Sequence, residues 1–439
     1  MSTQIGKGPR AHSRGRRLAA TIGSLVISAT LLTGCGPERS APTLTWYINP
    51  DAGGQAELAK RCTEAANGEY FIETSLLPRD AAAQREQLAR RLAAGDDSLD
   101  IMSIDPPFIP ELSVFLEPVP EGVAERTTEN TLEGALAGAM WEGELVSVPF
   151  WANTQILWYR ESVAEAANLD MSKPVTWNQI MEVADSQNKD LGVQGAAAES
   201  MTVWVNALIE SAGGEILKNP GAPAEELQLG LTSEAGREAA RIIGTIGDKG
   251  LGGPGLATST ENDSLTGFQT DDGSFMVNYP FVWPALNAAV EAGTLEQSVL
   301  DDVGWALYPR VYEDQPTAPP LGGINLGVGA ESDQPELAYD AIECIVQPEN
   351  QAYYFLTNGN PPSSSEAYED PRIAEEFPMA PTIRKSIELA APRPQTEYYN
   401  EISSGIQQIW SPPASVEPNV TPEESEEFIL AVLRGEKLL

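Results

Sequence analysis

The stretch TLTWYIN at Thr43–Asn49 opens the part of the chain that decides the fold, and DIMSI at Asp100–Ile104 closes it. Between them, apolar residues at helical spacing predict helices over Gly54–Asn67 and Ala81–Ala94. The β-rich stretch Tyr70–Leu77 lies between these helices and predicts a second strand. The resulting order β-α-β-α-β predicts a parallel sheet with helices on its faces.

Polar side chains stand where two of these strands stop. Asn49 ends the first strand, Asp105 follows the third, and a proline comes directly after each. Ligands of open parallel sheets bind beyond the carboxyl ends of the strands, so we expect both side chains to face one crevice. Gln84, one turn into the second helix, is expected on the same side. The alternative is that Asn49 and Asp105 only begin turns, as these residue types often do.

The N-terminus has the features of an export signal. Its first 34 residues carry five basic residues and no acid, and Leu18–Leu32 is an uncharged run. That run is too short to span a membrane, which takes about 20 apolar residues. It ends in Leu-Thr-Gly-Cys at Cys35, which resembles the bacterial lipobox, whose cysteine is acylated and becomes the first residue of the mature chain. We therefore predict a lipoprotein signal peptide over 1–34, lipidation of Cys35 and a flexible tether over 35–42; a plain signal peptide before a chance cysteine is the alternative.

The amino-acid composition excludes several classes of catalysis and binding. The chain has a formal net charge of −37, and its only histidine, His12, lies in the predicted leader. Without histidine, the mature chain has no Ser-His-Asp or Cys-His catalysis and no histidine metal ligand. Its acidity argues against nucleic acid, which requires clustered basic charge. For Cys62 and Cys344 an oxidising compartment favours one disulfide, with two separate buried thiols as the alternative. No metal or cofactor is expected.

The rest of the chain predicts a second α/β region. Glu144–Phe150 is expected to be a strand that leads through Trp151–Thr154 into another strand, Gln155–Arg160. A capping box at Thr176 and Gln179 predicts a helix start. Further strands are expected at Ser274–Asn278, Val303–Tyr308 and Ile324–Gly329. Helices are expected at Trp177–Asp185, Met201–Ala212, Ser233–Asp248, Glu261–Gln269, Pro284–Ala292, Pro335–Thr357, around Ala374–Leu389, Thr396–Trp410 and Pro422–Arg434.

Several short motifs follow one another in a characteristic order. They are LVSVPFWANTQILWY (Leu145–Tyr159), PVTW (Pro174–Trp177), FMVNYP (Phe275–Pro280), Gly322-Gly323 before a strand, and GNPP (Gly359–Pro362) after a long helix. In this order they resemble the carbohydrate-binding family of extracellular solute-binding proteins that serve ABC importers. Within that family, NYPFVW (Asn278–Trp283) and APRP (Ala391–Pro394) are most similar to the mycobacterial-type trehalose-recycling lipoproteins, with Tyr279 where those have Trp.

The resemblance implies an α/β, two-lobed fold of the type II periplasmic-binding-protein kind, with the ligand in a cleft between lobes. The first lobe would comprise 43–152 plus about 321–362, and the second 153–320 plus about 363–439. A sugar, such as the disaccharide trehalose, would bind there and pass to two permease subunits driven by a cytoplasmic ATPase. The protein would be a monomeric, non-enzymatic lipoprotein, anchored through Cys35 to the outer face of the cell membrane.

A sugar needs planar polar groups for paired hydrogen bonds and aromatic faces for its C–H patches. Purely structural roles are the alternative for several candidate residues. Tyr279 and Trp283 could be core residues, Arg393 could pair with a surface acid, and Glu261 could be an ordinary acid early in a helix. A polar residue inside the apolar crossing segment, Asn153, needs a partner if it is buried. The backbone N–H of Gly323 would lie close to the ligand, at a position where a side chain would collide with it. The expected ligand-binding residues are Asn49, Gln84, Asp105, Asn153, Glu261, Tyr279, Trp283, Gly323 and Arg393.

Other functions stay open. The same fold could bind a polyamine; the acidity of the chain favours this cargo, and the positive charge of Arg393 opposes it. It could also bind ferric ion, which the pairs Tyr353-Tyr354 and Tyr398-Tyr399 suggest. Both tyrosine pairs fall in predicted helices and are interpreted as packing residues. A glycoside hydrolase would use two carboxylates such as Asp105 and Glu261, at a separation that the sequence does not reveal. A structural or adhesive lipoprotein is the remaining alternative.

Overall fold

The computed structural model describes residues 41–439 of the chain. The predicted signal peptide and Cys35 lie outside the described residues. Within residues 41–439, no helix combines the length and the apolar character that crossing a membrane requires.

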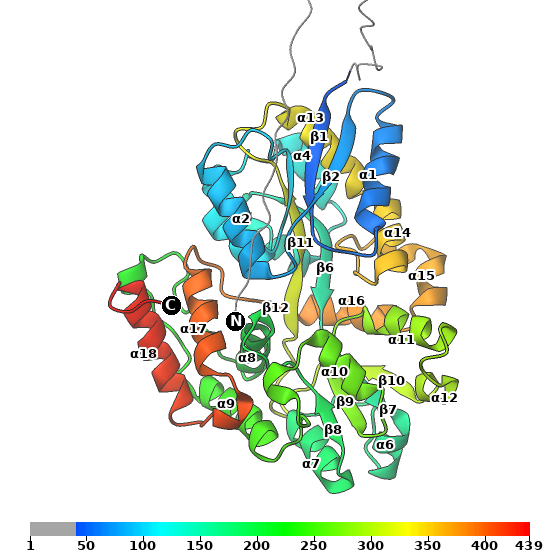
Figure 1. Cartoon of the computed structure of the whole chain (residues 1–439), viewed down its shortest axis with the longest axis vertical. Coiled ribbons are helices and arrows are strands. Elements are labelled where there is room, and N and C mark those ends of the chain that lie inside the picture. The colour runs from blue at the N-terminus through cyan, green and yellow to red at the C-terminus, as the bar shows by residue number, and fades with distance from the viewer. Residues whose placement is uncertain (1–40) are drawn as a thin grey trace, which may run out of the picture. The chain divides into compact units, whose positions relative to one another are not determined.

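The first sheet begins with the β-rich segment at Thr43–Asn49. β1 (Thr43–Ile48) pairs in parallel with β2 (Phe71–Leu76) and with β3 (Ile101–Ile104). α1 (Gly54–Ala65) and α2 (Ala81–Ala93) connect these strands, so the predicted β-α-β-α-β order is confirmed. In Figure 1 these elements lie together in the upper part of the picture. The predicted N-cap of α2 is present, because the Asp80 carboxylate accepts from the Ala83 N–H at 2.8 Å.

A second sheet has the strand order β10-β7-β9-β8. Its strands are β7 (Ile156–Arg160), β8 (Asp190–Gly192), β9 (Gly273–Asn278) and β10 (Val303–Ala306). Helices pack around it, and the capping box predicted at Thr176 and Gln179 begins the first of them. These helices are α7 (Trp177–Gln187), α8 (Glu199–Ser211), α9 (Glu234–Asp248) and α10 (Glu261–Phe268). We call the first sheet with its helices the first lobe, and this sheet with its helices the second lobe.

Two strands join the lobes. β6 (Val148–Thr154) pairs antiparallel with β11 (Pro320–Gly327) at the edge of the first sheet. After one buried residue, Gln155, the chain enters β7 of the second sheet. The prediction ended this strand at Phe150, but the structure extends it to Thr154 because residues 151–154 pair with 321–324. The predicted lobe boundaries themselves stay a prediction.

Proline corrects several predicted helix boundaries. The helix expected over Pro335–Thr357 is two helices, since the second begins at Pro348, which has no N–H to continue the first. The region around Ala374–Leu389 is likewise two helices. The helix expected from Pro284 begins at Val282, because proline is tolerated in a first turn. These and the last helices are α11 (Val282–Glu291), α13 (Pro335–Ile345), α14 (Pro348–Asn358), α15 (Pro371–Glu376), α16 (Ala380–Leu389), α17 (Tyr399–Ile409) and α18 (Thr421–Leu433).

The remaining elements are short. The 3₁₀ helix η1 (Pro106–Phe108) follows β3 directly, and β12 (Ala391–Pro392) pairs with the beginning of β11. The other short α-helices and strands are α3 (Ile109–Leu112), α4 (Glu121–Thr128), α5 (Glu133–Ala137), β4 (Met140–Trp141), β5 (Glu144–Leu145), α6 (Glu161–Ala166) and α12 (Gln297–Leu300). The other 3₁₀ helices are η2 (Ser113–Phe115), η3 (Ala224–Glu226), η4 (Leu256–Thr258), η5 (Ala367–Glu369) and η6 (Pro413–Ser415).

Each lobe has its own aromatic core. In the first lobe, Phe150 packs edge-on against Trp46, with ring centroids 5.8 Å apart, and stacks on Tyr354 at 5.0 Å. In the second lobe, Trp177 contacts both Trp204 and Tyr308. All these rings are buried, and each contributes about 1.5–3 kcal/mol of transfer free energy. A disulfide between Cys62 and Cys344 joins α1 to α13.

We predict that Glu210→Gln stabilises the protein above neutral pH. Glu210 is largely buried at the C-terminal end of α8, and burial and the nearby Glu215 raise its pKa to about 7. Because the pKa is raised on folding, stability is fully present below the unfolded value near 4.5 and is lost as pH rises through about 7. Urea denaturation should show the variant more stable than wild type by about 2 kcal/mol at pH 8, and equal to it at pH 4. Equal stabilities at both pH values would contradict this assignment.

Candidate functional site

A cavity of about 360 Å³ lies where the two lobes meet. Its walls come from the ends of β1 and β3, the crossing strands β6 and β11, and the beginnings of α8 and α10. The lining residues are Asn49, Pro50, Arg79, Ala81, Gln84, Asp105, Trp151, Asn153, Glu199, Ser200, Val203, Glu261, Tyr279, Gly322, Gly323, Ile324, Tyr354, Asn360 and Arg393.

The structure brings together eight of the nine residues that the sequence proposed for ligand binding. They come from segments far apart in the chain, yet all line this one cavity. These eight are Asn49, Gln84, Asp105, Asn153, Glu261, Tyr279, Gly323 and Arg393.

Trp283 is the exception: it was predicted to bind the ligand, but it does not line the cavity. Its indole N–H donates to the Glu376 carbonyl at 2.8 Å, and its ring packs edge-on against Trp305. Tyr279 precedes α11, which begins at Val282, so a spacing of four does not place Tyr279 and Trp283 on one helical face. Trp283 therefore packs beside the second sheet and does not line the cavity.

The first lobe presents an amide pair to the cavity. The Asn49 amide donates to Gln84 Oε1 at 2.8 Å, and the Gln84 amide donates to the Pro78 carbonyl at 2.7 Å. Gln55 in turn donates to the Asn49 backbone carbonyl. These bonds fix the orientation of both amides, so their positions are set before a ligand enters.

The crossing strands form another wall. Asn153 lies opposite Gly322 in the β6–β11 ladder, and its side-chain oxygen accepts from the Thr154 N–H at 3.0 Å. Gly323 has φ of +132°, and a Cβ there would lie 2.2 Å from the Trp151 carbonyl oxygen. Glycine is thus required by backbone conformation and by the close approach of the two strands.

The second lobe contributes Glu261 and Tyr279. Glu261 is the first residue of α10, and burial raises its pKa. Among the described residues no cation pairs with it. Burial also raises the pKa of Tyr279, which keeps the phenol protonated and able both to donate and to accept.

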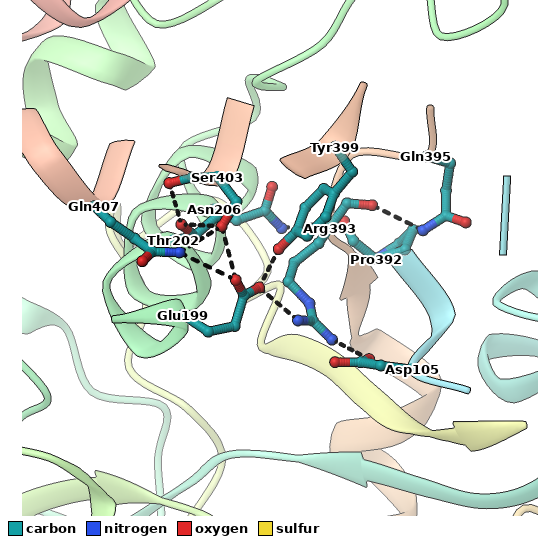
Figure 2. A network of polar contacts seen from close by, with 10 residues as sticks. All are labelled: Asp105, Glu199, Thr202, Asn206, Pro392, Arg393, Gln395, Tyr399, Ser403 and Gln407. Atoms are coloured by element: carbon teal, nitrogen blue, oxygen red, sulfur yellow. Dashed lines mark hydrogen bonds and ion pairs between the residues drawn. The ribbon is translucent and has the colours of Figure 1, made fainter. Parts of the chain in front are cut away.

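Arg393, which lines the cavity, lies between two carboxylates, as Figure 2 shows. Its Nη2 donates to Asp105 at 2.5 Å and its Nη1 donates to Glu199 at 2.7 Å. The arginine side chain is 5% exposed. Burial by itself would lower the pKa of Arg393, but the two carboxylates raise it well above its ordinary value. The guanidinium is therefore a permanent charge.

Among the wall residues that the sequence did not propose for ligand binding are Glu199, Trp151 and Tyr354. The helix that carries Glu199 was predicted from Met201, so its first acid was overlooked, although an acid in a first turn is a recognisable signal. Tyr354 was interpreted as a packing residue, and it is also part of the first core. Trp151 was quoted only as part of the crossing segment. In residues 41–439 no group of three or more acids or cysteines is arranged to hold a metal ion.

Comparisons with known proteins identify the family of this chain. The profile of the family described as bacterial extracellular solute-binding protein matches residues 57–383. A probable ABC transporter-binding protein of Deinococcus radiodurans is 22% identical over 397 residues, which cover 87% of this chain and 91% of the relative.

Solved structures show the same fold. Maltose-bound MalE3 of T. maritima superposes with a TM-score of 0.75 at 24% identity, covering 90% of this chain and all of that one. The GacH receptor of Streptomyces glaucescens, solved alone and with acarbose, gives a TM-score of 0.72 at 18% identity with the same coverage. The predicted two-lobed α/β fold is thereby confirmed.

We predict that Gly323→Ala destabilises the protein by at least about 2 kcal/mol, since the new methyl group adds a steric clash to an unfavourable backbone conformation. The neighbouring Gly322→Ala is the matched control: its Cβ would meet nothing closer than 3.8 Å. Thermal denaturation should separate the two variants by several degrees. Equal melting temperatures would show that the β6–β11 approach is less constrained than the structure indicates.

Proposed function

This chain belongs to the family of bacterial extracellular solute-binding proteins, and on that premise we propose that it captures a sugar for an ABC importer. The observation that carries the proposal is the cavity between the lobes, whose wall combines amides, carboxylates, an arginine and aromatic rings. Such a set matches a neutral ligand covered with hydroxyl groups, each of which donates and accepts. A volume of about 360 Å³ suits a small ligand, at the lower end of the range for pockets.

A disaccharide such as trehalose is the proposed cargo. The resemblance of Asn278–Trp283 and Ala391–Pro394 to trehalose-recycling lipoproteins supports it, as does the presence of Tyr279 and Arg393 at the cavity wall. Tyr279 provides an aromatic face for the C–H patch of a pyranose ring. Asn153 and Asn49 provide amides for vicinal hydroxyl pairs. Two permease subunits driven by a cytoplasmic ATPase would receive the sugar.

Lobe closure is the proposed mechanism. Asn49, Gln84 and Asp105 belong to the first lobe, whereas Glu261 and Tyr279 belong to the second. A ligand that contacts both groups binds the closed arrangement better than the open one, so binding shifts the population toward closure. The permease would then recognise the closed form.

Calorimetry on the Ser40–Leu439 fragment, which contains every described element, tests the cargo. We expect trehalose to bind and Asn153→Ala to weaken binding about tenfold, the effect of losing one or two hydrogen bonds to a ligand. Asn262→Ala, which removes an exposed amide next to Glu261, should bind like wild type.

Other outcomes identify the alternatives. The absence of any calorimetric binding signal with trehalose, maltose and related oligosaccharides would overturn the sugar proposal. Binding of spermidine with a steep salt dependence would favour a polyamine cargo, and a visible charge-transfer band would favour iron. Release of monosaccharides on incubation with a disaccharide would indicate a glycoside hydrolase.

We propose further that lipid on Cys35 holds the protein at the outer face of the membrane. A tether of a few residues would raise the effective concentration of the binding protein near its permease. Cys35→Ser should release the protein into the medium and lower sugar uptake by cells, while the affinity measured by calorimetry stays unchanged. Undiminished uptake with fully released protein would contradict a role for the anchor.

A further inference from the structure

Among the described residues, Glu261 is the one carboxyl group of the cavity wall that receives no hydrogen bond from another side chain. The carboxyl groups that line the cavity belong to Asp105, Glu199 and Glu261. Asp105 accepts from Arg393, and Glu199 accepts from Arg393 and from side chains of α17 (Figure 2). Both hydrogen bonds that Glu261 receives from other residues go to its backbone carbonyl instead. The acceptor sites of the Glu261 carboxylate are therefore available to a ligand.

One buried amide holds Glu261 beside Tyr279. The Asn278 side chain is fully buried; its Nδ2 donates to the Glu261 carbonyl at 2.9 Å, and its Oδ1 accepts from the Tyr279 N–H at 2.9 Å. Ser264 donates to the same Glu261 carbonyl at 3.0 Å. Burial, and after it the charge of Glu261, raises the pKa of Tyr279, as expected for neighbouring side chains. The wall thus places a carboxylate next to an aromatic ring.

The position of Glu261 in α10 favours the charged form of its carboxyl group. Glu261 is the first residue of this helix, where the free N–H groups and the helix dipole stabilise a negative charge. Burial raises the pKa of Glu261, a hydrogen bond from its own N–H opposes this rise, and the charge of Asp263 adds to it. A positive charge supplied by a ligand would lower that pKa again, because it stabilises the ionised carboxylate.

The charges on the cavity wall do not balance. Three carboxyl groups and the guanidinium groups of Arg79 and Arg393 line the cavity, so negative charge is in excess. Arg393 is buried between Asp105 and Glu199, whereas Arg79 is exposed and forms no ion pair within residues 41–439. Water screens an exposed charge, so Arg79 compensates little of the charge of Glu261. A ligand with one positive charge would balance the wall, and a neutral ligand would not.

From these contacts we propose that the preferred cargo is an amino sugar, with one ammonium group at Glu261 and Tyr279 and hydroxyl groups elsewhere. This inference rests on the proposed capture of a sugar and names the class of sugar. An ammonium group has three donors for a carboxylate, and its charge is attracted to the face of an aromatic ring. The amides of Asn49 and Asn153 match hydroxyl groups, and the charge of Arg393 opposes a second ammonium group.

Calorimetry on the Ser40–Leu439 fragment compares ligands that differ in a single group. The ligands are trehalose, its amino-deoxy derivatives with the amine at each position in turn, and the N-acetylated form of each derivative. The pH is about 7, below the pKa of about 8 that is typical of α-amino groups, so the amines are mostly protonated. We expect at least one amino derivative to bind about tenfold more tightly than trehalose, because hydrogen bonds to charged groups contribute more than neutral ones. Its N-acetylated form, which has an N–H but no charge, should lose this advantage.

Two variants of α10 test the assignment to Glu261. Glu261→Gln removes the charge and nearly keeps the shape, so the ratio of the affinity for the amino derivative to that for trehalose should fall about tenfold. Asp263→Asn is the matched control: it removes the same charge from an exposed side chain of the same helix that does not line the cavity. Asparagine retains an oxygen acceptor for the Thr260 N–H and hydroxyl, so this variant should keep the wild-type ratio.

Each contrary outcome has its own meaning. If no amino derivative binds more tightly than trehalose, the inference is overturned and the sugar proposal stands. Equal affinity for the ammonium and N-acetylated forms would show that charge is not recognised; this comparison uses the wild-type protein, so it decides the matter if Glu261→Gln does not fold. A preference that persists in Glu261→Gln would place the ammonium group elsewhere and overturn the assignment. The absence of binding by every sugar would overturn the sugar proposal and this inference with it.

Discussion

The pairing of β6 with β11 is the constraint on which the rest of the structure depends. β6 forms the edge of the first sheet and, after Gln155, becomes β7 of the second sheet. The Gln155 amide is buried and donates to Gln194, whose own amide donates to Ser264 and to the Val277 carbonyl. The crossing point is therefore anchored in the second lobe by buried amides and in the first lobe by a strand ladder. The proposed closure of the lobes would therefore pivot at this point.

Close approach of the two crossing strands also shapes the cavity. Gly323 lets β11 come near the Trp151 carbonyl, and the β6–β11 register changes at the next residues, between Ile324 and Asn325. A bulge of this kind turns the strand and redirects its side chains. Asn153 lines the cavity from one strand, and opposite it Gly322 and Gly323 leave space on the other. The glycines of β11 and the side chain of Asn153 together determine the shape of this wall.

Electrostatics distinguishes two kinds of charged group on the cavity wall. Arg393 is enclosed by Asp105 and Glu199, so its positive charge is paired, while its Nε is a buried donor without a partner in residues 41–439. Glu261, which also lines the cavity, has a raised pKa and no cationic partner among the described residues. A ligand therefore meets both an ionic cluster of two carboxylates around one guanidinium and a carboxyl group without a cationic partner. Hydroxyl groups, which donate as readily as they accept, match both.

The sequence by itself determined the element order and the places where strands end, because hydrophobic periodicity, turn residues and caps act over a few neighbouring positions. That local logic predicted Asn49 and Asp105, and resemblance extended the prediction to Glu261 and Arg393. Only the tertiary structure decided that Glu199 joins the wall and that Trp283 does not. Contacts such as Arg393 with Asp105 join residues 288 positions apart. Such pairings depend on how the two sheets are placed by the crossing strands, and no local pattern encodes that placement.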